Sequence, residues 1–227
     1  MVKNLICNNC GVSNPIYSLN CSNCNSFLRA RIPNIDLWDT IWNILVSPTE
    51  TAVKIIQAEK KNFVAFLLSI WFVKSSINYF IISNYSNHTV SLADALHKGG
   101  LLSVLIMICV TFLINQLLKL TKTESRYKDI LAVYTYSLIP IILAFVFLTP
   151  FHIALYGFYW YTINPPPLVI KPFVSYVLYC IESLFYLWVL LLLVLTTYVQ
   201  LGGKKIISLV IGVALFLILF GYQLLIA

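Results

Sequence analysis

The sequence predicts an all-α integral membrane protein, with five transmembrane helices preceded by a small four-cysteine head and amphipathic juxtamembrane helices. The first observation is composition: hydrophobic residues make up 60% of the 227 residues and charged residues only 10%, with a mean hydropathy of +0.87. A soluble domain contains about 25% charged residues, so most of this chain is expected to lie in lipid. The second observation is two Cys-x2-Cys pairs in a polar N-terminal stretch, ahead of five long apolar stretches.

The head comprises residues 1–28, and its four cysteines are Cys7, Cys10, Cys21 and Cys24. Two Cys-x2-Cys pairs separated by ten residues can close a tetrahedral four-thiolate Zn²⁺ site, and Gly11 suits the turn after the first pair. Two disulfides are disfavoured by a reducing cytoplasm, and a redox motif would normally stand in a βαβ pattern, which is absent. The head is too small to bury a core, so we expect a zinc ribbon whose structural Zn²⁺ supplies the folding energy.

Residues 29–61 are expected to form an amphipathic juxtamembrane segment. Apolar residues recur there at helical spacing, among them Leu37, Trp38 and Trp42. This pattern predicts a short helix lying in the membrane interface with two tryptophan anchors. A second helix is predicted to begin at residues 47–50, SPTE, which place serine at the cap, proline at the first helical position and glutamate three residues after the cap. Both helices are interpreted as docking the head onto the membrane domain.

The predicted membrane domain comprises residues 62–227. A hydrocarbon core about 30 Å thick needs about 20 residues of helix. The stretches that come near this length are about 62–82, 101–118, 130–148, 173–199 and 206–226. Pro140 removes a backbone donor inside the third stretch, so we expect a kink there. The aromatic-rich residues 149–172 are interpreted as an interfacial belt, with a binding lip as the alternative.

The basic residues predict the orientation. Six lysines and arginines lie in the N-terminal region, four between the second and third stretches and two between the fourth and fifth, whereas the other loops hold only Lys98 and Lys171. The positive-inside rule then predicts a cytoplasmic N-terminus and, with five spans, an outer C-terminus. We interpret the net charge of +7 as a topology signal rather than as a nucleic-acid-binding surface. Residues 1–61 show no cleavable signal peptide, so the first span is expected to act as the insertion signal.

Two charged residues, Lys74 and Glu182, lie deep within the first and fourth stretches. Ionisable residues at such depth are costly and are usually paired or functional. Each lies on a polar stripe, Lys74 with Asn78 and Glu182 with Tyr179 and Tyr186, and such stripes face a bundle interior or a wet cavity. The two interpretations are a structural ion pair between the spans and a polar cavity for a lipid head group or a proton. Lys74 could also snorkel without a partner.

The sequence contains no recognisable catalytic residues. His88, His97 and His152 show no metal-ligand spacing and no spacing with an acid and a serine, and there is no phosphate-binding glycine loop. A closed four-thiolate site leaves no open coordination position for catalysis. The sequence therefore favours a protein that is not an enzyme.

Two segments resemble the Yip (Ypt/Rab-interacting protein) domain family. Residues 36–50, DLWDTIWNILVSPTE, resemble its pre-membrane segment, although Asp39-Thr40 stands where Gly-Pro is common, and residues 134–140, YTYSLIP, are similar to its Gly-Tyr-Ser…Pro segment, with Thr135 in place of glycine. The resemblance covers about residues 33–227. It implies a five-span membrane scaffold with a cytoplasmic N-terminus, of the prokaryotic type with an N-terminal zinc ribbon.

The resemblance also implies a docking surface. In eukaryotic members the cytoplasmic segment contacts prenylated Rab GTPases. The corresponding candidate docking residues here are Asp36, Leu37, Trp38 and Trp42.

Two functions from different classes are predicted. The first is a non-catalytic scaffold in membrane organisation or trafficking-like processes, with the zinc ribbon as a cytoplasmic docking module for an unidentified cytoplasmic or membrane protein. The alternative is a lipid-binding or transport protein that uses Lys74, Glu182 and Asn78. It would resemble the Arv proteins, which also place a four-cysteine head before membrane spans but carry a Tyr-Arg-His motif that is missing here. The expected location is a prokaryotic cytoplasmic membrane, and small-xxx-small pairs are too sparse to argue for a homo-oligomer, which stays open.

Overall fold

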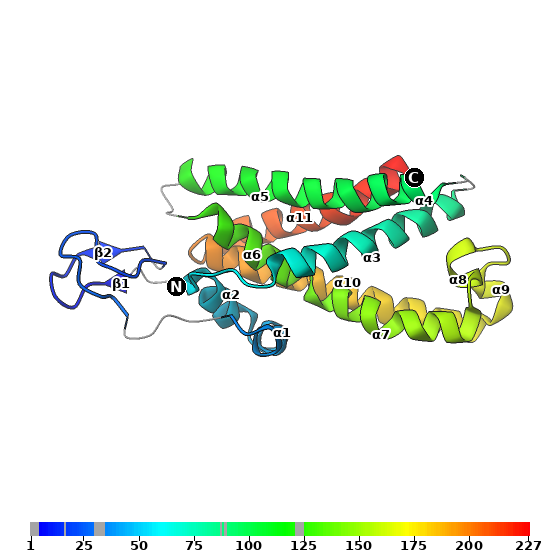
Figure 1. Cartoon of the computed structure of the whole chain (residues 1–227), viewed down its shortest axis with the longest axis horizontal. Helices are drawn as coiled ribbons and strands as arrows, with labels where there is room; N and C mark the ends of the chain where they lie inside the picture. The colour runs from blue at the N-terminus through cyan, green and yellow to red at the C-terminus, as the bar shows by residue number, and fades with distance from the viewer. Residues whose placement is uncertain (1–4, 16, 30–34, 87, 89, 121–124) are drawn as a thin grey trace.

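The computed structural model describes residues 5–15, 17–29, 35–86, 88, 90–120 and 125–227. It confirms the predicted fold class, because five helical stretches are long and apolar enough to cross a membrane and a four-cysteine cluster precedes them. The long helices run side by side along the long axis of the molecule, with the N-terminal head, drawn in blue, at one end (Figure 1). We call that end the head end, and the opposite end, where the C-terminus lies, the far end.

Among the described residues before α3 (Val64–Tyr85), the structure has two strands and two short helices. The head holds β1 (Leu5–Ile6) and β2 (Ser13–Asn14), paired antiparallel. They are followed by α1 (Leu37–Val46) and α2 (Pro48–Gln57). In Figure 1, α1 is seen almost end-on while the long helices run lengthwise, so α1 lies across the bundle at the head end. This is the orientation expected of an interfacial helix.

The five candidate spans are built from eight helices. The first is α3 (Val64–Tyr85), and the second joins α4 (Leu92–Asp94), the π-helix η1 (Ala95–Leu101) and α5 (Leu102–Leu120). The third joins α6 (Tyr127–Ser137) and α7 (Ile139–Tyr156), the fourth is α10 (Pro172–Gln200) and the fifth is α11 (Lys205–Ile226). Between the third and the fourth, α8 (Tyr159–Thr162) and α9 (Pro167–Ile170) fold over at the far end (Figure 1).

The central helix of the bundle is α6. Nearly all its side chains from Asp129 to Ser137 are buried, and it contacts α2, α3, α5 and α10. The helix ends at Ser137, and after Leu138 α7 begins at Ile139 with Pro140 in its first turn. Proline has no N–H and fits the first turn of a new helix better than the interior of an old one, so the expected kink takes the form of a helix break.

Two spans are longer than the sequence suggested. The second begins at Leu92 rather than near residue 101, because Ser91 caps it: the Ser91 hydroxyl accepts from the N–H of Asp94 at 3.1 Å and donates to its carboxylate at 2.6 Å. The third continues to Tyr156 rather than ending near residue 148. Its last turn is held by packing, since His152 and Tyr156 lie with ring centroids 4.0 and 5.2 Å from Trp160 of α8. Part of the expected aromatic belt is therefore helix and buried cluster.

Two glycines let η1 pack closely against α3. A Cβ atom on Gly99 would lie 2.7 Å from the Cβ of Tyr79 and 2.8 Å from the carbonyl oxygen of Ser75, and one on Gly100 would lie 2.4 Å from the hydroxyl of Ser76. Neighbouring backbone cannot move away without shifting a whole helix. The π-helical turn also leaves the Gly99 carbonyl available, and the hydroxyls of Ser75 and Tyr222 donate to it at 2.8 and 2.7 Å.

Replacing Gly99 with alanine is expected to destabilise the protein by about 1–3 kcal/mol, the usual cost of forcing an extra carbon into a packed interior. Gly221→Ala is the matched control, because Gly221 lies in α11 and nothing lies within 4 Å of its Cβ position. That change should be neutral or slightly stabilising. Thermal unfolding of the two detergent-solubilised variants compares them, and equal melting temperatures would show that the close approach of η1 to α3 is not required.

Candidate functional site

The four head cysteines converge on one point. Their sulfur atoms all lie within 4.8 Å of one another, with 3.5 Å between Cys7 and Cys24 and 3.4 Å between Cys10 and Cys21. Four thiolates bound to Zn²⁺ at about 2.3 Å stand about 3.8 Å apart in a tetrahedron. All four cysteines are free thiols, so the cluster can hold a metal ion.

Both cysteine pairs use the same backbone turn. The N–H of Gly11 donates to the carbonyl of Cys7 at 2.9 Å, and the N–H of Asn25 donates to the carbonyl of Cys21 at 3.1 Å. The turn requires a left-handed residue after the second cysteine, with φ of +72° at Gly11 and +57° at Asn25. Asparagine is the residue that tolerates this conformation best after glycine, and the match between CNNCG and CSNCN is the sequence signal for the repeated turn.

Two polar side chains support the cysteines. The Asn14 side chain is buried between the two cysteine pairs. Its Nδ2 donates to the sulfur of Cys21 at 3.6 Å, and its Oδ1 accepts from the backbone N–H of Ser22 at 2.9 Å. The hydroxyl of Ser26 lies 3.1 Å from the sulfur of Cys7 and 3.0 Å from that of Cys24. Hydrogen bonding from Ser26 lowers the pKa of Cys24 to about 5 and also lowers the pKa of Cys7, which favours the thiolate form of these two ligands. The pKa of Cys10 is raised to about 11.

The head is attached to the membrane domain through arginines. The guanidinium of Arg126, just before α6, lies 4.3 Å from the ring centroid of Tyr17 and donates to the carbonyl of Ile56 at 3.1 Å. Arg29 donates to the carbonyl of Gln57 at 3.4 Å. Both guanidinium groups therefore donate to backbone carbonyls in the last turn of α2, which have no partner within the helix. In the sequence, Arg29 and Arg126 contributed only to the distribution of basic residues that predicts the orientation.

A buried ion pair lies beside this attachment. Lys61 Nζ lies 2.8 Å from Asp129 Oδ1, and Arg126 Nε donates to Asp129 Oδ2 at 2.8 Å. The Lys61 ammonium also donates to the carbonyls of Ile56 at 3.2 Å, Ala58 at 2.7 Å, and Ile55. Burial lowers the pKa of Lys61, and the Asp129 carboxylate partly offsets that effect. This cluster ties the end of α2 to the start of α6.

The four candidate docking residues fall on two faces of α1. Asp36 caps the helix by accepting from the N–H of Asp39 at 2.9 Å, and Leu37 packs against the core. Trp38 and Trp42 point away from the core and are 75% and 69% exposed. The structure therefore separates the two tryptophans, which are free to contact lipid or a partner, from Asp36 and Leu37, which build the helix.

Lys74 and Glu182 form an ion pair. Lys74 Nζ lies 2.6 Å from Glu182 Oε1, and the two side chains are 7% and 17% exposed. Each residue lies ten or eleven positions from the far-end terminus of its helix, which corresponds to about 15 Å of depth. The two helices therefore present opposite charges at matching levels near the middle of the span.

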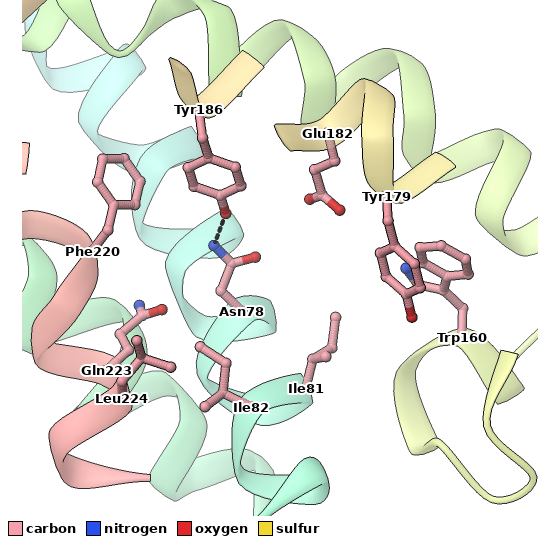
Figure 2. Close-up of a pocket in the computed structure, with 10 residues that line it drawn as sticks. All are labelled: Asn78, Ile81, Ile82, Trp160, Tyr179, Glu182, Tyr186, Phe220, Gln223 and Leu224. Atoms are coloured by element: carbon pink, nitrogen blue, oxygen red, sulfur yellow. Dashed lines mark hydrogen bonds between the residues drawn. The ribbon is translucent and has the colours of Figure 1, made fainter. Parts of the chain in front are cut away.

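A cavity of about 230 Å³, with both polar and apolar lining residues, adjoins the pair. Its lining residues are Asn78, Ile81, Ile82, Trp160, Tyr179, Glu182, Tyr186, Phe220, Gln223 and Leu224. Figure 2 shows the Glu182 carboxylate pointing into the space between α10 and α3, and Asn78 Nδ2 donating to the Tyr186 hydroxyl, which lies 2.8 Å away. Leu224 is 70% exposed, so the cavity reaches the outer surface of the bundle.

Sequence reasoning missed the contribution of α11 to this site. Gln223 donates through Nε2 to the Ser75 hydroxyl at 2.6 Å and to the Ser75 carbonyl at 3.1 Å, and both residues are buried. On the side of the cavity toward the far end of the molecule, the Trp160 ring stacks between those of His152 and Tyr179, with ring centroids 4.0 and 4.9 Å apart. The polar pair Tyr222-Gln223 in an otherwise apolar stretch was the signal available in the sequence.

Comparison with known proteins identifies the family. A family model described as the Yip1 domain matches residues 42–225, a range that runs from the middle of α1 almost to the end of α11 and leaves out the cysteine head. No curated protein and no solved structure matches the chain. Because the match covers most of the chain and all five candidate spans, the protein belongs to the Yip1 domain family.

Proposed function

We propose that this protein is a non-catalytic membrane scaffold whose head is a structural zinc ribbon that docks a protein partner at the cytoplasmic face. The observation that carries the proposal is the exposure of the head's apolar side chains: Ile6 is 69% exposed and Phe27 is 81% exposed. The head contacts the membrane domain through Tyr17 and Arg126, yet the side chains of Ile6 and Phe27 stay exposed. Two large apolar side chains left exposed on so small a domain are available for contact with another protein.

The choice of zinc rests on the ligand set. Four thiolates in a tetrahedral cluster suit Zn²⁺, and a cluster closed by four protein ligands leaves no position for a substrate. The Zn²⁺ ion, when bound, would hold the two turns together, and Asn14 and Ser26 would orient the sulfurs.

The location rests on charge and on the head. Basic residues crowd the head end, and toward the far end the sequence places only Lys98, in η1, and Lys171, which supports a cytoplasmic head and an outer C-terminus. A reducing cytoplasm also keeps cysteines available for metal. Together with the resemblance to zinc-ribbon forms of the family, this favours a prokaryotic cytoplasmic membrane.

Changing Ile6 and Phe27 together to serine is expected to abolish partner contacts while the head keeps its metal, because neither side chain lies among the sulfurs. The measurement is crosslinking of the full-length protein in cells, with the recovered neighbours identified by mass spectrometry and the metal content measured in parallel. Phe158→Ser is the matched control, since Phe158 is 85% exposed at the far end. Recovery of the same neighbours by the Ile6/Phe27 variant and the control would show that the head is not the docking module.

A second candidate function is binding of a lipid at the cavity beside Lys74 and Glu182. The observation that favours it is the cavity itself, because a carboxylate facing a cavity of about 230 Å³ near mid-membrane offers a polar contact to a lipid head group. Glu182→Gln is expected to change the lipid that co-purifies, as read by native mass spectrometry, without changing membrane insertion. An unchanged lipid profile would count against this function.

A further inference from the structure

A second cavity, of about 220 Å³, lies at the head end between α5, α6, α10 and α11. Its walls are almost entirely apolar and include Ile114, Leu118, Tyr134, Thr197, Gln200 and Ile211. Pockets that enclose whole ligands usually exceed about 300 Å³, so this one suits a single chain or part of a larger molecule. It belongs neither to the cysteine head nor to the cavity beside Glu182.

One polar side chain in this cavity has no partner. Gln200 is 9% exposed, and neither its Nε2 nor its Oε1 has a hydrogen-bond partner among the residues that the structure describes. The neighbouring polar groups are satisfied, since the Tyr134 and Thr197 hydroxyls lie 3.0 Å apart. A buried amide that makes no hydrogen bond is unfavourable. The amide atoms of Gln200 expose almost no surface to the cavity, so a rotation of the side chain toward the polar end of a bound ligand would relieve an existing cost.

The depths of the lining residues within their helices indicate how a ligand would be oriented in the cavity. Gln200 is the last residue of α10, while Thr197, Ile114 and Ile211 lie about one turn deeper in their helices. The lining residues Leu117 and Ile207 are 53% and 47% exposed, so the cavity reaches the lipid-facing surface. An apolar chain can therefore enter from the membrane, with its polar end at Gln200.

Charge at the mouth selects the head group. Lys119 follows the lining residue Leu118, and Lys204 and Lys205 precede the lining residue Ile207. All three are exposed, and none forms an ion pair with another described residue. Three exposed lysines at the head-end termini of α5 and α11, close in sequence to lining residues of the cavity, suit a lipid phosphate.

We propose that this cavity binds one anionic phospholipid from the head-end leaflet. One acyl chain fills the space between Ile114 and Ile211. An ester carbonyl accepts a hydrogen bond from Gln200 Nε2, and the phosphate lies beside Lys119, Lys204 and Lys205.

The test is native mass spectrometry of the full-length protein titrated with phosphatidylglycerol and with phosphatidylcholine of the same acyl chains. The native protein should retain one phosphatidylglycerol, and Gln200→Leu should weaken retention about tenfold, the value of one good hydrogen bond. The combined Lys119→Gln, Lys204→Gln and Lys205→Gln variant should lose the preference for phosphatidylglycerol. Lys98→Gln, an exposed lysine at the far end, should change nothing.

A second readout separates a ligand site from a structural role. Without added lipid, Gln200→Leu should melt at a higher temperature than the native protein, because it removes the unpartnered amide. Phosphatidylglycerol should then raise the melting temperature of the native protein more than that of the variant. A lower melting temperature without lipid would overturn the proposal, because Gln200 would then have a structural partner. Equal retention of the two lipids, or of phosphatidylglycerol by all variants, would overturn it as well.

Discussion

Replacing Cys7 with serine is expected to abolish metal binding and unfold the head while the five helices stay in the membrane. Structural zinc contributes about 10–16 kcal/mol of apparent binding free energy to small domains. Among the described head residues only Cys7, Cys21 and Asn14 are buried, so no apolar core would remain to replace that energy. The membrane domain has its own buried core around α6 and does not depend on the head.

The measurement is metal content per chain, together with limited proteolysis. Native protein should carry one zinc and resist cleavage within residues 5–29, whereas Cys7→Ser should carry none and be cut there. Cys180→Ser is the control, because Cys180 lies exposed in α10, far along the chain from the cluster. A strong chelator should reproduce the effect of Cys7→Ser. Retention of zinc by the Cys7 variant would mean that the four sulfurs do not form one site.

Replacing Lys74 with methionine is expected to destabilise the membrane domain by about 3–5 kcal/mol, the typical cost of breaking a buried ion pair by removing one partner. The cost arises because the Glu182 carboxyl group is left in a low-dielectric interior without the ammonium group that lies 2.6 Å away in the native protein. Glu182→Leu should destabilise for the same reason, because it leaves Lys74 without its partner. Both variants are compared by thermal unfolding in detergent, with Lys98→Met as the control at an exposed far-end position.

The double variant Lys74→Met/Glu182→Leu decides what the pair is for. If the pair only locks α3 to α10, two apolar side chains of similar size should recover most of the stability. Retained lipid, measured on the same preparations, reports the second role. A double variant that is stable but has lost its lipid would assign the pair to binding, whereas single variants that are as stable as the native protein would show that water or snorkelling satisfies each charge.

Helix caps show how far sequence reasoning reached and where it stopped. The start of α2 at Pro48 was predicted, because serine, proline and glutamate all stand at the required spacing. The start of α4 was not, although the Ser91 hydroxyl accepts from the N–H of Asp94, a cap hydrogen bond that Ser47 does not make at the start of α2. A polar cap outside an apolar stretch carries no hydropathy signal, so a search for apolar windows passes over it.

The cysteine head also has one feature that the sequence predicts and one that it does not. Cysteine spacing was enough to predict a four-sulfur cluster, because two Cys-x2-Cys turns can meet in only a few ways. The attachment of the head through Tyr17 and Arg126 involves residues more than a hundred positions apart. Aromatic and cationic residues are both common in such a chain, so nothing in their local sequence selects this pair.

The sequence by itself determined the number of spans, the cysteine cluster, the family resemblance and the presence of charges at depth, because each depends on composition or on spacing along one helix. Only the tertiary structure decided which groups meet: Lys74 with Glu182, Gln223 with Ser75, and Gly99 with α3. It also left the amide of Gln200 without a partner. The reason is physical, since lipid leaves an apolar surface of one helix with no preferred partner, and the choice falls to close packing and buried hydrogen bonds between residues distant in sequence.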